Sequence, residues 1–122
     1  MLDSKKNALA AATIFLASLQ TAVAAERTLS GPEIAPFLQS IVSMGKNSRQ
    51  TFSHDGTTSY SENGRYSAGR WQVQGDKYCS QWPPNTAWAC YNVTIDEEAG
   101  TIIWQDGSDN PETGTYKVKD GS

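Results

Sequence analysis

The sequence predicts a mainly β protein: an antiparallel meander of six to seven strands, curled into a small open barrel or half-barrel, with one short helix near its N-terminus. Two observations lead to this prediction. After Arg49, residue pairs typical of tight turns recur about every ten residues, and apolar and polar residues alternate between them. The turn pairs are Asp55-Gly56, Asn63-Gly64, Gly75-Asp76, Pro83-Pro84, Ala99-Gly100, Asp106-Gly107 and Thr113-Gly114.

Length and composition restrict what the chain can be. It has 122 residues, which is enough for one domain, and 10 Lys and Arg against 13 Asp and Glu give a formal charge of −3. Proteins that bind nucleic acids usually carry a basic excess, so we expect no nucleic-acid partner. The aromatic content of 10 % is too high for a disordered acidic chain, and a folded domain is therefore expected.

Residues 1–25 have the pattern of an export signal. Lys5 and Lys6 precede a run of apolar and small residues over 8–19, and small residues follow at 22, 24 and 25. The run is shorter than the roughly 20 residues needed to cross a bilayer, so we expect cleavage and no membrane anchor. Residues 26–122 would then form a single small disulfide-bonded β domain, with eight basic and twelve acidic residues and a formal charge of −4.

The one predicted helix begins after Ser30. Ser30 and Glu33 have the spacing of a capping box, and Pro32 stands near the first helical position, where a missing N–H costs little. Apolar residues then follow with helical spacing and form a single stripe: Ile34, Phe37, Leu38 and Ile41. We interpret this segment as a short helix that packs on the sheet.

Turn geometry predicts the register of the following hairpins. A two-residue loop at Gly75-Asp76, a Cys79–Cys90 pair and a four-residue loop over 97–100 each determine one register. Together they predict the cross-strand pairs Val73–Tyr78, Trp71–Ser80, Gln74–Lys77, Tyr78–Tyr91, Ser80–Ala89, Ile95–Ile102 and Val93–Trp104. A three-residue loop over 55–57 predicts a further pair between Phe52 and Tyr60.

These registers place the apolar residues on one face and the polar residues on the other. A slip of one residue would reverse the facing of a strand, so the agreement between independent turns supports the register. The predicted inner face contains Trp71, Val73, Tyr78, Trp82, Tyr91, Val93, Ile95, Ile102 and Trp104, extended by Tyr116 and Val118 on a last strand. The outer face contains Arg70, Gln72, Gln74, Lys77, Cys79, Gln81, Trp88, Cys90 and Asn92.

Cys79 and Cys90 are the two cysteines of the chain. An even pair in a small exported protein is typical of a disulfide, which persists in an oxidising compartment. Metal binding by this pair is disfavoured, because the single histidine, His54, stands on a different hairpin. We therefore expect a disulfide, no metal site and no cofactor.

The residues offer little for catalysis. A nucleophile–histidine site would have to use His54, which stands beside a predicted turn where histidine is commonly only solvated. Acidic residues at 96–98 fall at another turn, an ordinary place for surface carboxylates. We predict no catalytic residues, and hence a protein that is not an enzyme.

Three residues are candidates for binding. Trp82 and Trp88 flank the loop that contains Pro83-Pro84, and two tryptophans on a rigid loop are typical of interaction sites. Arg70 is predicted on one cross-strand row with Gln81 and Trp88, where a cation–π contact is feasible. The alternative is structural: Trp82 belongs to the core by its strand position, and Trp88 shields the disulfide.

The segment 69–84, Gly-Arg-Trp-Gln-Val-Gln-Gly-Asp-Lys-Tyr-Cys-Ser-Gln-Trp-Pro-Pro, continues with Trp88-Ala89-Cys90-Tyr91. This pattern resembles that of a group of small exported Gram-negative bacterial proteins of unknown function. The segment 29–34 and the turn at 55–57 are similar to parts of the same pattern. The resemblance implies export and a common fold for most of the mature chain, and it implies no activity.

Function is therefore expected to lie in binding. The first hypothesis is a non-enzymatic periplasmic or secreted monomer with a protein or glycan partner. The second is an inhibitor of a cell-wall or host hydrolase, whose loop 82–88 would enter an enzyme cleft. The third is a carrier of a small apolar ligand, which requires that the aromatic inner face leaves a cavity.

Overall fold

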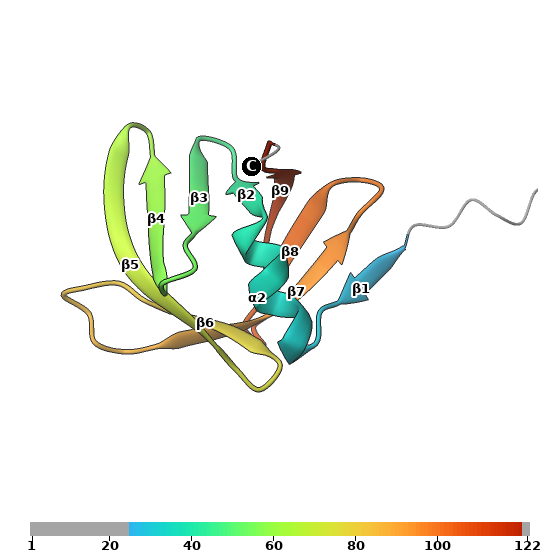
Figure 1. Ribbon diagram of the computed structural model, residues 1–122, viewed down its shortest axis with the longest axis horizontal. Helices are drawn as coiled ribbons and strands as arrows, with labels where there is room; N and C mark the ends of the chain where they lie inside the picture. Colours follow the sequence, from blue (N-terminus) through green and yellow to red (C-terminus); the bar gives the residue numbers. More distant parts are fainter. Residues whose placement is uncertain (1–24, 121–122) are drawn as a thin grey trace, which may run out of the picture.

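The computed structural model describes residues 25–120, and the predicted export signal lies outside this range except for its last residue. The described elements are β1 (Glu26–Thr28), α2 (Gly31–Gln39), β2 (Ile41–Met44), β3 (Ser48–Phe52), β4 (Thr57–Glu62), β5 (Arg65–Gln74), β6 (Lys77–Gln81), β7 (Ala89–Asp96), β8 (Thr101–Gln105) and β9 (Glu112–Val118) (Figure 1). No helix among these elements has the length and apolar character needed to span a membrane.

Strands β2 to β9 form a closed antiparallel barrel of eight strands, and β1 adds a ninth strand beside β7. Each strand pairs with the next along the chain, and pairing of β2 with β9 closes the sheet. The prediction of a mainly β fold with one helix is confirmed. The prediction of six to seven strands in an open or half-open barrel is wrong, because closure gives every barrel strand two neighbours.

The sequence did not predict closure of the barrel, and the reason lies at Ile41. The apolar stripe of the predicted helix included this residue, but α2 ends at Gln39 and Ile41 begins β2. Ile41 pairs with Val118, and Ser43 pairs with Tyr116, so β2 is the strand that joins the two ends of the sheet. Because β2 begins directly after α2, Ile41 continues the helical spacing of apolar residues by coincidence. The alternation of apolar and polar residues that is typical of a strand is therefore not recognised in β2.

The connections divide the barrel into two ends. At one end lie β1, α2 and the turns between β3 and β4, β5 and β6, and β7 and β8. The other end carries the connections at residues 45–47, 63–64, 82–88 and 106–111. Figure 1 shows α2 against the strands, while the hairpin of β6 and β7 reaches out to the left below β5.

Helix α2 covers its end of the barrel through an apolar stripe and a polar anchor. Ile34 and Leu38 are fully buried, and the helix packs against β2, β3, β5 and β6. The backbone N–H of Ser30 donates to Glu33 Oε1 at 2.9 Å, as the predicted capping box requires. The backbone N–H of Gly31 donates to Asp76 Oδ1 at 2.7 Å, which attaches the start of α2 to the turn between β5 and β6.

The predicted registers of β5 to β8 are confirmed. All seven cross-strand pairs predicted for these four strands are present. The pairing predicted for Phe52 and Tyr60 is wrong: Phe52 pairs with Thr58, and Tyr60 pairs with Gln50. The loop between β3 and β4 spans 53–56, because Asp55 Oδ1 accepts from the backbone N–H of Thr57 and so ends the turn there. The shift is two residues, so Phe52 and Tyr60 still share the inner face.

The core fills the helix-covered end and the middle of the barrel. Its buried members are Leu29, Ile34, Leu38, Ile41, Phe52, Trp71, Tyr78, Val93, Ile95 and Ile102. The Phe52 ring contacts those of Trp71 and Tyr78 edge to face, with centroids 5.8 and 5.6 Å apart. Val118 does not extend this core as predicted, because it lies near the end of β9 and is 69 % exposed.

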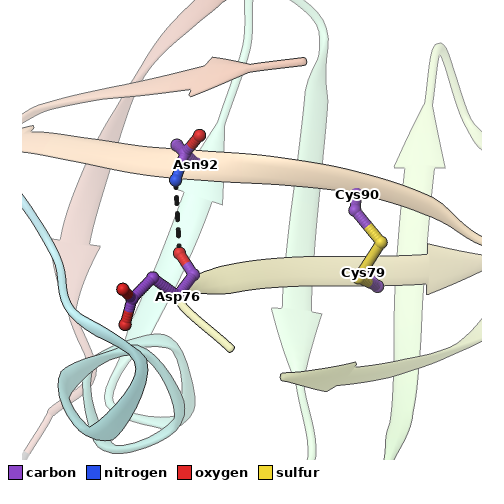
Figure 2. The surroundings of a disulfide bond; sticks show 4 residues. All are labelled: Asp76, Cys79, Cys90 and Asn92. Atoms are coloured by element: carbon purple, nitrogen blue, oxygen red, sulfur yellow. Dashed lines mark hydrogen bonds between the residues drawn. A yellow bond between two sulfur atoms is a disulfide. The ribbon is translucent and has the colours of Figure 1, made fainter. Parts of the chain in front are cut away.

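The predicted disulfide between Cys79 and Cys90 is confirmed and joins β6 to β7 (Figure 2). Cys79 is fully buried. Asn92 Nδ2 of β7 donates at 3.3 Å to the backbone carbonyl of Asp76, in the turn just before β6. The disulfide therefore fastens the hairpin that carries the loop 82–88, and the amide contact fastens its opposite end.

Candidate functional site

A cavity of about 570 Å³ lies at the end of the barrel away from α2, and we call it the mouth cavity. Its lining comes from β3 to β9 and from the loop after β6. The lining residues are Gln50, Tyr60, Tyr66, Ser67, Ala68, Tyr78, Ser80, Trp82, Pro83, Tyr91, Trp104 and Glu112. The aromatic inner face predicted from the sequence therefore leaves a space at one end of the barrel.

Strand register places these side chains around the cavity. Four cross-strand pairs contribute both of their members to the lining: Gln50–Tyr60, Tyr60–Ser67, Tyr78–Tyr91 and Trp104–Glu112. Alternate residues of a barrel strand point inward. Tyr91, Trp104 and Glu112 lie toward the strand ends farthest from α2, whereas Tyr78 lies near the other end of β6. Helix α2 packs over the other end and contributes no residue to the lining of the mouth cavity.

Six of the twelve residues that line the cavity are aromatic. The Tyr60 ring lies 6.0 Å from that of Trp82, and the Tyr78 ring lies 6.2 Å from Tyr91 and 5.1 Å from Trp104. Trp82 fits here because residue 69 is glycine: a Cβ at Gly69 would lie 2.6 Å from Trp82 Cε3. The indole thus packs directly against the backbone of β5.

Hydrogen bonds fix the positions of the Gln50 and Trp82 side chains in the cavity wall. Gln50 Nε2 donates to Thr58 Oγ1 at 3.0 Å and to the Tyr78 hydroxyl at 3.2 Å. Trp82 Nε1 donates to Ser80 Oγ at 3.2 Å. These bonds orient the rings before any ligand arrives, which lowers the entropy lost on binding.

Burial and charge raise the pKa values of two tyrosines in the wall. Burial raises the pKa of Tyr78 to about 12, although hydrogen bonds to Ser80 and Gln50 oppose the change. Partial burial also raises the pKa of Tyr91, and the negative charges of Glu112 and Asp106 add to this effect. Both phenols are therefore neutral at pH 7.

Glu112 is the one charged side chain among the described residues that line the mouth cavity. It is exposed to solvent and makes no ion pair or hydrogen bond within residues 25–120. Two neighbouring cavities of about 100 and 510 Å³ share lining residues with the mouth cavity, and Tyr60 lines all three. Glu112 belongs to the mouth cavity and to the smaller neighbour.

The structure separates the three binding residues predicted from the sequence. Trp82 lies in the wall of the mouth cavity and is partly buried, between the core and the surface positions predicted for it. Trp88 is 38 % exposed in the loop and makes no ring contact within the described residues. Arg70 is exposed and pairs with Gln81, so the predicted contact between Arg70 and Trp88 is absent.

Several lining residues were not predicted as site residues. Tyr91 and Trp104 were predicted as core, and Tyr60 and Glu112 received no binding role. Their position in the sequence could have indicated a site. Each lies in the half of its strand nearest to one of the connections at 45–47, 63–64, 82–88 and 106–111. If α2 covers one end of the barrel, the inward-facing residues near these connections must line the other, open end.

No three His, Cys, Asp or Glu side chains within residues 25–120 gather closely enough to hold a metal ion. His54 lies at the helix end, with Nδ1 3.4 Å from Gln39 Oε1, far along the barrel from the mouth connections.

Comparison of the chain with protein-family models, with curated proteins and with solved structures finds no match. The resemblance to small exported bacterial proteins stays a prediction. The geometry of the mouth cavity is therefore the basis for a functional assignment.

Proposed function

We propose that this protein is a non-enzymatic binding module that takes a small organic ligand with an aromatic or apolar part into the mouth cavity. The observation that carries the proposal is the cavity of about 570 Å³, walled by aromatic rings. Ligand sites typically measure roughly 300 to 1,000 Å³ and combine apolar walls with a few placed polar groups. Eight-stranded barrels have an interior that holds side chains or one small ligand.

The compartment belongs to the same proposal. A disulfide between Cys79 and Cys90 suits an oxidising compartment, and together with the predicted export signal it supports a periplasmic or secreted protein. Mass spectrometry of the protein recovered from culture medium and from envelope and cytoplasmic fractions would test this. An intact bridge in exported protein supports it, and free thiols in a cytoplasmic pool would contradict it.

A variant that fills the cavity tests the binding function. Ser67 lines the mouth cavity and pairs with Tyr60, so Ser67→Trp places an indole in the space without removing a core side chain. Ser61 lies on the same hairpin, alternates with Tyr60 and Glu62 along β4, and lines none of the three cavities. Ser61→Trp is therefore the matched control.

Three probes of similar size and different charge serve as ligands: benzyl alcohol, phenylacetate and benzyltrimethylammonium. Two-dimensional amide NMR spectra should show shifts at the mouth residues with at least one probe. The shifts should vanish in Ser67→Trp and persist in Ser61→Trp. The proposal is contradicted if no probe shifts mouth resonances at millimolar concentration, or if both variants respond alike.

The loop between β6 and β7 supports a second candidate, the inhibitor of a cell-wall or host hydrolase. Residues 83–88 are all exposed, including Trp88, and the hairpin projects from the barrel (Figure 1). A folded Trp88→Ala variant should lose inhibition of a peptidoglycan hydrolase that the unaltered protein inhibits. Unchanged inhibition would remove this loop from consideration.

A further inference from the structure

We infer that the ligand of the mouth cavity is an organic cation, whose ammonium group lies between the aromatic wall and Glu112. This inference rests on the proposed binding function and specifies its substrate class. It depends on three features of the cavity: the sign of its one charged lining residue, the rings around it, and the placement of nearby arginines.

Glu112 supplies the negative charge. Its carboxylate has no cationic partner within residues 25–120, although it lines a cavity whose other described lining residues are uncharged. Arg27, on β1 at the helix-covered end, forms ion pairs with Glu33 and Glu97 rather than with Glu112. A cationic ligand would therefore meet a carboxylate free to pair, whereas an anionic ligand would be repelled.

The rings supply a second attraction for a cation. Tyrosine and tryptophan faces carry negative potential and attract cations within about 6 Å of the ring centre. Tyr60 and Trp82 stand on one side of the lining, and Tyr91 and Trp104 belong to strands β7 and β8, which pair with each other. Glu112 pairs with Trp104 across β8 and β9, so the carboxylate and an indole occupy adjacent positions.

The electrostatic effect of Glu112 reaches into the cavity. Its negative charge is one of the causes that raise the pKa of the Tyr91 phenol, after burial. Glu112 and Tyr91 come from β9 and β7, the two strands that flank β8. The ammonium group is placed inside the cavity that Glu112, Tyr91 and Trp104 line together.

Two arginines lie in the neighbouring cavities. Arg49 lines the cavity of about 100 Å³, which Glu112 also lines, but the two side chains form no ion pair. Arg65 lines the cavity of about 510 Å³, where it pairs across strands with Glu62. Neither lines the mouth cavity. The positively charged part of the ligand is therefore assigned to the mouth cavity itself, and an uncharged part can extend past Tyr60.

A pair of isosteric probes isolates the charge. Benzyltrimethylammonium and its uncharged carbon isostere, neopentylbenzene, have the same shape, and the ratio of their affinities measures the preference for the cation. NMR titration of the mouth resonances gives both dissociation constants. In the unaltered protein the ratio should favour the cation, although the neutral probe is the more hydrophobic of the two.

Glu112→Gln should lower this ratio about fivefold, since an exposed ion pair contributes up to about 1 kcal/mol, which is roughly fivefold in affinity. The affinity for neopentylbenzene should stay unchanged. Glu98→Gln is the matched control, because it alters the net charge equally at the turn between β7 and β8, at the other end of the barrel. Raising the salt concentration should also reduce the ratio in the unaltered protein and in Glu98→Gln.

The outcomes separate this inference from the binding function. Preferential binding of neopentylbenzene, benzyl alcohol or phenylacetate at the mouth overturns the cation assignment and keeps the binding function. An equal loss in Glu112→Gln and Glu98→Gln also overturns the assignment, because it would show a long-range effect of net charge. If none of the four probes shifts the mouth resonances, both proposals are contradicted.

Discussion

At Gly69 the backbone of β5 lies directly against the indole ring of Trp82. An added Cβ would stand 2.6 Å from Trp82 Cε3 and 2.8 Å from the carbonyl oxygen of Gln81. The glycine therefore allows Trp82 to fold back over the sheet as a wall of the mouth cavity. Gly69 and Trp82 both belong to the segment 69–84 singled out in the sequence, and the structure brings them into contact.

Gly69→Ala should displace Trp82 and destabilise the fold. Overpacking of this kind typically costs about 1 to 3 kcal/mol, because neither the carbonyl nor the ring can retreat without losing contacts. Urea denaturation followed by tryptophan fluorescence measures the change. Ser67→Ala, two residues away on the same strand, is the control and should stay within about 0.5 kcal/mol. Equal midpoints for the two variants would contradict the role assigned to Gly69.

Tyr78 makes stability depend on pH in the alkaline range. Burial raises its pKa from an ordinary value of 10 to about 12 in the folded protein. Below pH 10 the phenol is protonated in both states, so it contributes no pH dependence. Between pH 10 and 12 the unfolded chain releases the proton first, and the free energy of unfolding should fall by about 2 to 3 kcal/mol.

Denaturation at a series of alkaline pH values tests this effect. Tyr78→Phe should make the fall shallower, since a phenylalanine releases no proton in either state. Tyr66→Phe is the control, because Tyr66 is 71 % exposed. The same slope in Tyr78→Phe and in the unaltered protein would show that Tyr78 is not responsible.

At the scale of elements, the turn between β5 and β6 positions α2. Asp76 Oδ1 accepts from the first N–H of the helix, and Gly31 lies so close to Gly75 that a Cβ there would clash with its carbonyl oxygen. A carboxylate at a helix N-terminus also interacts favourably with the helix dipole. The cover of the barrel is therefore held by one hairpin turn as well as by its apolar stripe.

Asp76→Ala should loosen this attachment. Loss of a capping carboxylate typically costs about 0.5 to 2 kcal/mol, and the helix should show it first as faster amide hydrogen exchange in α2. Asp109→Ala is the matched control, since the Asp109 side chain is exposed and makes no hydrogen bond or ion pair within residues 25–120. Unchanged exchange in α2 would contradict the anchoring role.

The elements differ in how well the sequence predicts them. Turn pairs determine the register of β5 to β8, because a tight loop leaves one way to pair its flanking residues. The hairpin of β3 and β4 is displaced by two residues, since the Asp55 side chain shapes a longer loop. Strand β2 was missed, because its start at Ile41 continues the helical spacing of α2.

For the whole molecule, closure depends on residues far apart in the sequence. The pairing of β2 with β9 joins Ile41 to Val118, and no turn links these strands. Local signals therefore predict the inner face and most of its members, but they do not predict the closed barrel. The mouth cavity depends on closure and on the position of α2, which explains why Trp82 was predicted as a candidate and Glu112 was not.

The disulfide should stabilise the whole barrel. In the chain-entropy model, a loop as short as the one closed by Cys79 and Cys90 contributes about 3 kcal/mol by restricting the unfolded chain. The double variant Cys79→Ala, Cys90→Ala should unfold at a correspondingly lower denaturant concentration, and reductant should leave its midpoint unchanged. Reduction of the unaltered protein should produce a similar loss. If neither change lowers the midpoint, the bridge has no stabilising role.

Helix α2 covers one end of the barrel, and this asymmetry determines how a ligand of the proposed binding module would enter and leave. None of the three cavities is lined by α2, and the buried ring of Phe52 contacts the Tyr78 and Trp104 rings of the mouth cavity. In the proposed binding module, a bound molecule would therefore leave through the mouth by which it entered. Exchange of one ligand for another would be sequential, because the first would have to leave before the second could bind. A bulky tail on the ligand would emerge at the mouth, so a probe tethered through that tail to a solid support should still be captured.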